Sequence, residues 1–227
     1  MMRITEQLAH LQERIQRAAA LAGRKNDSVT ILAVSKKQST DAIREALAAS
    51  LLDFGENYLQ EALPKIAEID LPARWHFIGT IQSNKTRSIA ENFDWVHTVD
   101  SRRIAERLSM QRPQSTGDLQ TLIQICPQNA DKRGGIPAEQ LFELADIMRK
   151  LPRIRLRGLM SMPLPNQSMV ESRREFARTR ELLGELLQRG HDVDTLSMGM
   201  SADLEAAIME GSTIVRIGTD LFGPRRR

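Results

Sequence analysis

The sequence predicts an α/β protein built as a single (β/α)8 TIM barrel with one additional helix at its N-terminus. Eight short apolar runs alternate with helical segments, a pattern typical of parallel sheets with right-handed crossovers. Eight units in about 200 residues fit a closed barrel near the low end of its size range. A doubly wound open sheet is the alternative, but no G-x-G-x-x-G turn follows the first strand. We expect one domain over residues 1–227.

The first helix and the first strand are indicated by a change of pattern near Gly23. Residues 3–22 carry apolar side chains at helical spacing, whereas residues 29–34 (VTILAV) form the nearly continuous apolar run of a strand buried on both faces. Lys36 and Lys37 follow this strand at the end where α/β folds bind ligands. They are either solvated lysines that begin a loop, or one of them is placed to form an imine with a carbonyl cofactor.

The remaining elements follow from the same alternation. Further strands are expected at 51–55, 75–79, 95–99, 119–125, 154–159, 194–197 and 213–217. Helices are expected from 40 to 49, from 58 to 69, after 82–85 as far as 92, after 100–101 as far as 113, from 137 to 150, from 168 to 189 and from 202 to 210.

Composition narrows the class of protein. Hydrophobic residues make up 41% of the 227 residues and charged residues 27%, as in ordinary globular proteins. No apolar run approaches the roughly 20 residues that a membrane span needs. The N-terminal segment lacks the apolar core of a signal peptide, and the single cysteine, Cys126, cannot form an internal disulfide. We therefore expect a cytoplasmic protein that does not contact a membrane.

The charge pattern argues against nucleic-acid binding. The formal net charge is +3, and basic and acidic residues are interspersed along the helical segments. The arginines at 225–227 form the one compact basic cluster, which we interpret as a solvated tail. Aromatic residues make up only 4% of the chain, so stacking surfaces for single strands are scarce.

Polar residues follow most of the expected strands, where they would face the mouth of the barrel. They are Lys36, 56–57, 82–85, Arg133, Ser161, Ser201, Arg216 and 218–219.

The ends of the seventh and eighth strands form a pattern. Barrels often hold a phosphate between these two loops, where free backbone N–H groups face the anion. Ser201 is expected to be a helix N-cap whose hydroxyl could instead contact a phosphate oxygen, and Gly218 would let the backbone approach closely. Each residue alone is more often structural. Together with a lysine after the first strand, they indicate a site for a phosphorylated carbonyl compound.

Five segments of the chain resemble the pyridoxal-phosphate homeostasis protein family. They are VSK at 34–36, FGENYLQE at 54–61, WHFIGTIQSNK at 75–85, RLRGLMSMP at 155–163 and SMGMSADLEAAIMEGSTIVRIGTDLFG at 197–223. The family comprises barrel-only relatives of the alanine racemase N-terminal domain. The resemblance extends from the first helix to Gly223.

The resemblance implies that Lys36, rather than Lys37, carries pyridoxal 5′-phosphate (PLP) as a Schiff base. Alternation along a strand supports only one of the two, since neighbours point to opposite faces. The resemblance also implies that Arg216 is directed at the pyridine nitrogen. A permanent cation there disfavours protonation of that nitrogen, so the ring is a weaker electron sink than it is beside a carboxylate.

The remaining pocket residues come from the same resemblance. It implies that the phosphate is held by the loops after the last two strands, through Ser201, Gly218 and Thr219, and that Met200 also belongs to the cofactor site. Asn57 and His76 lie on motifs that match the family's pocket. His76 could equally be a core histidine that is hydrogen-bonded between strands.

The sequence departs from the family pattern at three places. Gln38 stands where a lysine is common, Cys126 where an asparagine is often seen, and Arg133 with Gly134–Gly135 replaces a K-S-G segment. These changes remove amines that could exchange the cofactor with Lys36. They put a second cofactor site in doubt while leaving the primary pocket intact.

Two functions from different classes fit a lysine-bound cofactor in a barrel. A PLP-dependent amino-acid racemase needs an acid/base on each face of the substrate, and alanine racemases supply a tyrosine from a second domain; here the only tyrosine is Tyr58, and the sequence ends soon after the eighth strand. A protein that sequesters PLP and supplies it to apo-enzymes needs only the open site. We expect the second, non-catalytic function, and a monomer. An inert scaffold would leave the phosphate pattern unexplained.

Overall fold

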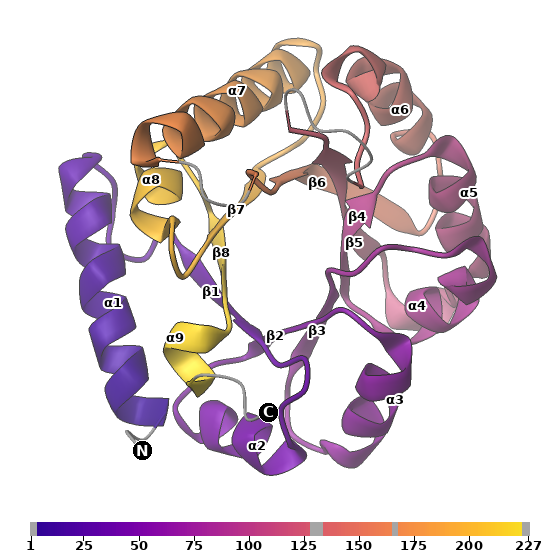
Figure 1. Cartoon of the computed structure of the whole chain (residues 1–227). Coiled ribbons are helices and arrows are strands. Elements are labelled where there is room, and N and C mark those ends of the chain that lie inside the picture. The colour runs from indigo at the N-terminus through magenta and orange to yellow at the C-terminus, as the bar shows by residue number, and fades with distance from the viewer. Residues whose placement is uncertain (1–3, 128–133, 165–167, 224–227) are drawn as a thin grey trace.

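Eight parallel strands close into a barrel, hydrogen-bonded in chain order and sealed by the pairing of β1 with β8 (Figure 1). The computed structural model describes residues 4–127, 134–164 and 168–223. The strands are β1 (Thr30–Val34), β2 (Asp53–Glu56), β3 (Arg74–Phe77), β4 (Trp95–Val99), β5 (Leu119–Ile125), β6 (Ile154–Ser161), β7 (Thr195–Met200) and β8 (Ile214–Ile217). The barrel expected from the sequence is confirmed, and the open-sheet alternative is wrong.

Helices surround the barrel, as Figure 1 shows along its axis. They are α1 (Ile4–Leu21), α2 (Thr40–Ala48), α3 (Leu59–Glu68), α4 (Thr86–Asn92), α5 (Arg102–Gln111), α6 (Leu141–Met148), α7 (Met169–Gln188), α8 (Leu204–Met209) and α9 (Thr219–Phe222). Across the described ranges, no helix combines the length and the apolar character that crossing a membrane requires.

The region after β7 differs from the sequence expectation. β7 continues to Met200, which pairs with Arg216, instead of ending at Ser197. The backbone N–H of Met200 donates to Asp203 Oδ1 at 2.6 Å, so a turn over residues 201–203 separates the strand from α8, which begins at Leu204 rather than at 202. The expectation that Ser201 is the N-cap is therefore wrong.

Alternation along the strands separates an outer apolar layer from a partly polar interior. On β3, Trp75 and Phe77 belong to the main hydrophobic cluster, whereas His76 lies between them on the other face. His97 of β4 and Arg216 of β8 are also buried. Branched apolar side chains usually fill the interior of such barrels, so these polar groups indicate a specific role.

Helix α1 is the additional helix and packs outside the barrel against α8 and α9 (Figure 1). Its buried stripe contains Ile4, Leu8, Leu11 and Ile15. Burial of this stripe accounts for the position of α1, because an isolated amphipathic helix is held mainly by packing of its apolar face.

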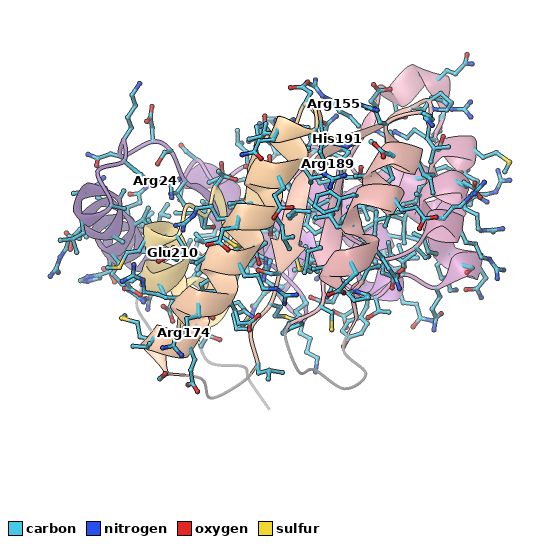
Figure 2. The ribbon with its side chains drawn as sticks, turned by 90° about the horizontal axis from the view of Figure 1, so that it is seen from above. Arg24, Arg155, Arg174, Arg189, His191 and Glu210 are labelled. Atoms are coloured by element: carbon cyan, nitrogen blue, oxygen red, sulfur yellow. The ribbon has the colours of Figure 1, made fainter. Side chains whose placement is uncertain are left out.

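Helix α7 is fastened to the end of α8 by a buried carboxylate. Glu210, labelled in Figure 2, accepts hydrogen bonds from Arg173 at 2.8 Å and from Arg180 at 2.5 Å. A capping box between Ser168 and Glu171 begins α7. These contacts hold the two helices that support β7.

Candidate functional site

Lys36 and Lys37 lie in different environments just after β1. Lys36 is half-buried, whereas Lys37 is exposed, has a φ of 62°, and donates its backbone N–H to Glu61 Oε2 at 2.9 Å. The turn thus directs the two neighbours differently. Lys36 is the one that is withdrawn from solvent at the mouth of the barrel.

A buried cluster fixes the residue that precedes Lys36. Lys65 Nζ donates to the Ser35 carbonyl and to Glu56 Oε1, both at 2.8 Å, and Ser35 Oγ donates to the same carboxylate oxygen at 2.7 Å. The Lys65 and Glu56 side chains are only 10% and 0% exposed. These hydrogen bonds join β1, β2 and α3. Breaking the buried pair would leave an uncompensated charge in the core, so the three elements are held in one arrangement.

Two neutral side chains at the mouth carry a buried polar atom that has no hydrogen-bond partner within the part of the chain that the structure describes. The atoms are Asn57 Oδ1, after β2, and Ser161 Oγ, at the end of β6. Gly79 allows the next loop to pack on Asn57, because a Cβ there would lie 2.0 Å from the Asn57 carbonyl oxygen. Buried polar groups without partners cost free energy, so these two atoms fit a site for a polar ligand.

Arg216 brings a buried positive charge to the same end of the barrel. Its Nη1 donates to Ser197 O at 2.6 Å and to Ser197 Oγ at 2.8 Å, and its Nη2 donates to Ser161 O at 2.9 Å. Burial lowers the pKa of Arg216 to about 10, with Asp203 opposing the shift, so the guanidinium stays charged at neutral pH. No ion pair joins Arg216 to a carboxylate among the described residues.

The two loops expected to hold a phosphate lie at the ends of β7 and β8. Ser201 is half-buried in the turn after β7, and the preceding Met200 is 38% exposed. Gly218 precedes α9, whose first residue, Thr219, is exposed. A Cβ on Gly218 would make only ordinary contacts of 3.6 Å with Val34, so packing within the protein does not require glycine there.

His76 lies in the interior rather than at the mouth. Its Nε2 is 3.0 Å from Asp53 Oδ1, its Nδ1 is 3.0 Å from His97 Nε2, and it stacks on Trp95 with an interplanar angle of 5°. Both ring nitrogens are engaged, which is the arrangement of a core histidine. Burial lowers the pKa of His76 despite the attraction of Asp53, so the ring is neutral at neutral pH.

Comparison with known proteins shows to which family the sequence belongs. The sequence matches the family described as alanine racemase, N-terminal domain, over residues 7–226. It is 54% identical over 223 residues to the pyridoxal phosphate homeostasis protein of Pseudomonas aeruginosa, covering 98% of this chain and 96% of that protein. Its identity to the protein of the same name from Escherichia coli K12 is 46% over 229 residues, covering 98% and 97%. The chain belongs to the pyridoxal phosphate homeostasis protein family.

Solved structures agree with this membership. PipY of Synechococcus elongatus without PLP superimposes with a TM-score of 0.88 at 37% identity, covering 97% of this chain and 100% of PipY. PipY with PLP bound has a TM-score of 0.82 at 36% identity, with the same coverage. Alanine racemase from Corynebacterium glutamicum shares the fold, with a TM-score of 0.72 at 16% identity, over 98% of this chain and 62% of that enzyme.

In this member of the homeostasis family, Arg14 ties both candidate phosphate loops to α1. Its Nη2 donates to the Ser201 carbonyl at 3.0 Å, its Nη1 pairs with Asp220 of α9, and its Nε donates to Glu205 of α8 at 2.8 Å. The hydrogen bond to Glu205 raises the pKa of Arg14, partly offset by burial. Sequence reasoning missed this residue, and its only local signal is a position beside the buried stripe of α1.

The three departures from the homeostasis family pattern fall in separate places. Gln38 is half-buried and donates its backbone N–H to Ser35 O at 2.9 Å. Cys126 is half-buried directly after β5. Arg133 lies outside the described residues, so the second-site question stays a prediction.

Proposed function

We propose that this chain binds PLP at the C-terminal mouth of its barrel, as a Schiff base on Lys36, and that it sequesters the cofactor and supplies it to apo-enzymes. The observation that carries the proposal is the placement of a half-buried lysine and of Arg216 at the ends of the paired strands β1 and β8. Arg216 is a buried cation that forms no ion pair with a carboxylate of the described residues. Membership of the family and the PLP-bound structure of PipY support it.

The residues at the mouth fit this cofactor. Asn57 Oδ1 and Ser161 Oγ offer unmatched polar atoms, and a side chain on Gly218 would make only ordinary contacts within the protein. In this proposal Met200, Ser201, Gly218 and Thr219 hold the phosphate, and Arg216 faces the pyridine nitrogen. When bound, PLP supplies an electrophilic carbon and a ring that accepts electron density. The charge of Arg216 disfavours protonation of that ring, which favours holding the cofactor over catalysis.

Within the described ranges, neither the tyrosine nor His76 is placed to serve as the second base of a racemase. Racemisation requires a proton acceptor on each face of the substrate α-carbon. The only tyrosine of the sequence, Tyr58, is 56% exposed just before α3. His76 is neutral, and both of its ring nitrogens are engaged in the interior. We therefore prefer the carrier to the PLP-dependent racemase.

The carrier proposal makes a testable prediction about amino acids. We expect holo-protein incubated with alanine or serine in deuterated water to incorporate no deuterium at the α-position above the rate of free PLP, as measured by mass spectrometry. When it is mixed with an apo form of a PLP-dependent enzyme, activity should appear as the cofactor passes across. Incorporation that requires Lys36 and approaches about 10 per second, the median for enzymes, would instead establish a catalyst.

A second prediction concerns the tie made by Arg14. Arg14→Ala should weaken PLP binding by about tenfold, equivalent to about 1.4 kcal/mol, because the loops after β7 and β8 lose their common anchor. The free energy of unfolding should fall by only about 1 kcal/mol, since these ion pairs are partly exposed. Absorbance titration and urea unfolding measure the two effects.

The matched control for Arg14 is Arg17→Ala, which removes an exposed arginine from the same helix. It should leave both PLP affinity and stability unchanged. Equal losses of affinity in the two variants would show that Arg14 acts only through the overall charge of α1.

A further inference from the structure

A continuous chain of buried hydrogen bonds crosses the barrel interior from Arg216 to Asp53. Arg216 Nη1 lies 2.8 Å from Ser197 Oγ, which lies 2.9 Å from His97 Nδ1. His97 Nε2 is 3.0 Å from His76 Nδ1, and His76 Nε2 is 3.0 Å from Asp53 Oδ1. The five residues come from β8, β7, β4, β3 and β2, and all are buried.

The chemistry of the two ends sets the direction of every bond. Arginine only donates, so Ser197 Oγ accepts from Arg216 and is left to donate its own proton to His97 Nδ1. Burial, together with the nearby His76 and Arg216, lowers the pKa of His97 well below its usual value. A neutral His97 then carries its proton on Nε2 and donates to His76 Nδ1. His76 in turn donates from Nε2 to Asp53, a carboxylate that accepts.

Asp53 provides a permanent negative charge at the opposite mouth. Burial alone would raise the pKa of Asp53, but hydrogen bonds from Arg74 and His76 lower it to about 2. Arg74 donates from Nε and Nη2 to the two carboxylate oxygens, both at 2.7 Å. Asp53 and Arg74 also line a cavity of about 350 Å³ at the N-terminal ends of β1 to β3. The chain of hydrogen bonds thus joins the two mouths of the barrel.

We propose that Ser197, His97, His76 and Asp53 are positioning residues for Arg216, forming a one-directional relay of hydrogen bonds that fixes its guanidinium and ends on a carboxylate. A buried cation with no carboxylate in contact is costly unless aligned polar groups compensate it. The relay fixes Arg216 of β8 against Ser197 of β7 through neutral groups, so no carboxylate among the described residues is bonded to the guanidinium, and Asp203 acts on it only through its charge. Its effect on the cofactor rests on the proposed function; the relay itself does not.

The ligand-free protein tests the relay directly. Nitrogen-15 NMR at neutral pH should show His76 and His97 neutral and protonated on Nε2. Asp53→Asn should shift the ring-nitrogen signals of His97, although the two side chains are separated by His76. The control Asp94→Asn removes an equal charge from the residue beside β4 whose carboxylate accepts from the Trp75 N–H instead. Asp94 acts on His76 through its charge alone, so this variant should shift His97 less than Asp53→Asn does.

The second measurement uses PLP bound to the full chain. Removing the Asp53 charge, or the Ser197 hydroxyl that accepts from Arg216, leaves the positive charge of Arg216 less compensated, so the pH midpoint of the bound cofactor's visible absorption should fall by about one unit in Asp53→Asn and in Ser197→Ala. Because both changes interrupt one relay, the double variant should show no larger shift than either single one. If Asp53→Asn does not fold, Ser197→Ala carries the comparison with wild type.

Several results would overturn the relay. A charged ring or an Nδ1–H tautomer at His76 or His97 contradicts the assigned direction. An unshifted His97 in Asp53→Asn, or equal shifts in Asp53→Asn and Asp94→Asn, shows a diffuse field instead of a relay. Additive midpoint shifts show two independent effects. A protein that binds no PLP refutes the proposed function, and the ligand-free measurement alone then decides on the relay.

Discussion

Lys36→Ala is expected to abolish covalent attachment of PLP. Borohydride reduction of the wild-type protein should fix a phosphopyridoxyl group on Lys36, and mass spectrometry of its peptides should find none at this site in the variant. Affinity should fall by at least about tenfold, equivalent to about 1.4 kcal/mol, because the imine is lost while the expected phosphate contacts remain. The characteristic visible absorption should disappear.

The neighbouring residue supplies a matched control for Lys36. Lys37 is exposed, and its backbone is turned toward Glu61. Lys37→Ala should therefore retain the label, the absorption and the affinity. If reduction labelled Lys37 or Lys85 in the wild-type protein while Lys36 stayed unmodified, the assignment of the attachment site would be wrong.

The fold could be predicted because it depends on patterns that are local in the sequence. An apolar run such as 29–34, repeated eight times in alternation with helical segments, leaves few architectures other than a closed parallel barrel. The position of Lys36 follows from the same pattern, since the carboxyl ends of parallel strands form the mouth. The family motifs then indicated roles for residues after the first, second, seventh and eighth strands.

The side chains that hold the candidate site in place could not be predicted in the same way. Arg14 reaches the Ser201 carbonyl across 187 residues of sequence, and Lys65 is a charged residue buried on a helix where exposure is the usual outcome. Such side-chain pairings depend on the packing of distant elements, which periodicity does not reveal. The short helix α9 and the extension of β7 to Met200 also depend on tertiary pairing, as the register with Arg216 shows.

A match to a family motif did not establish the role of His76. The segment around it matches the family, yet strand alternation directs its ring into the interior, where Asp53 and His97 engage both nitrogens. Sequence alone could not choose between a pocket histidine and a core histidine. The geometry connects it to Arg216 only through His97 and Ser197.

Lys65→Met is expected to lower the free energy of unfolding by about 3–5 kcal/mol, because it leaves the Glu56 carboxylate buried without its cation. Glu56 Oε2 already has no hydrogen-bond partner among the described residues, so little can compensate within the cluster. The Ser35 carbonyl would also lose one of its two donors and keep only the Gln38 N–H, which should shift Lys36 and weaken PLP binding. Urea unfolding measures the stability, and absorbance titration measures the affinity.

Two further variants distinguish a buried pair from a general effect of charge. Lys150→Met removes an exposed lysine and should change stability by no more than about 0.5 kcal/mol. Glu56→Gln combined with Lys65→Met removes both charges and should recover part of the loss, because no unpaired carboxylate remains in the core. A loss below about 1 kcal/mol in Lys65→Met alone would mean that water reaches Glu56. The cluster beneath Lys36 would then be no more stabilising than a surface ion pair.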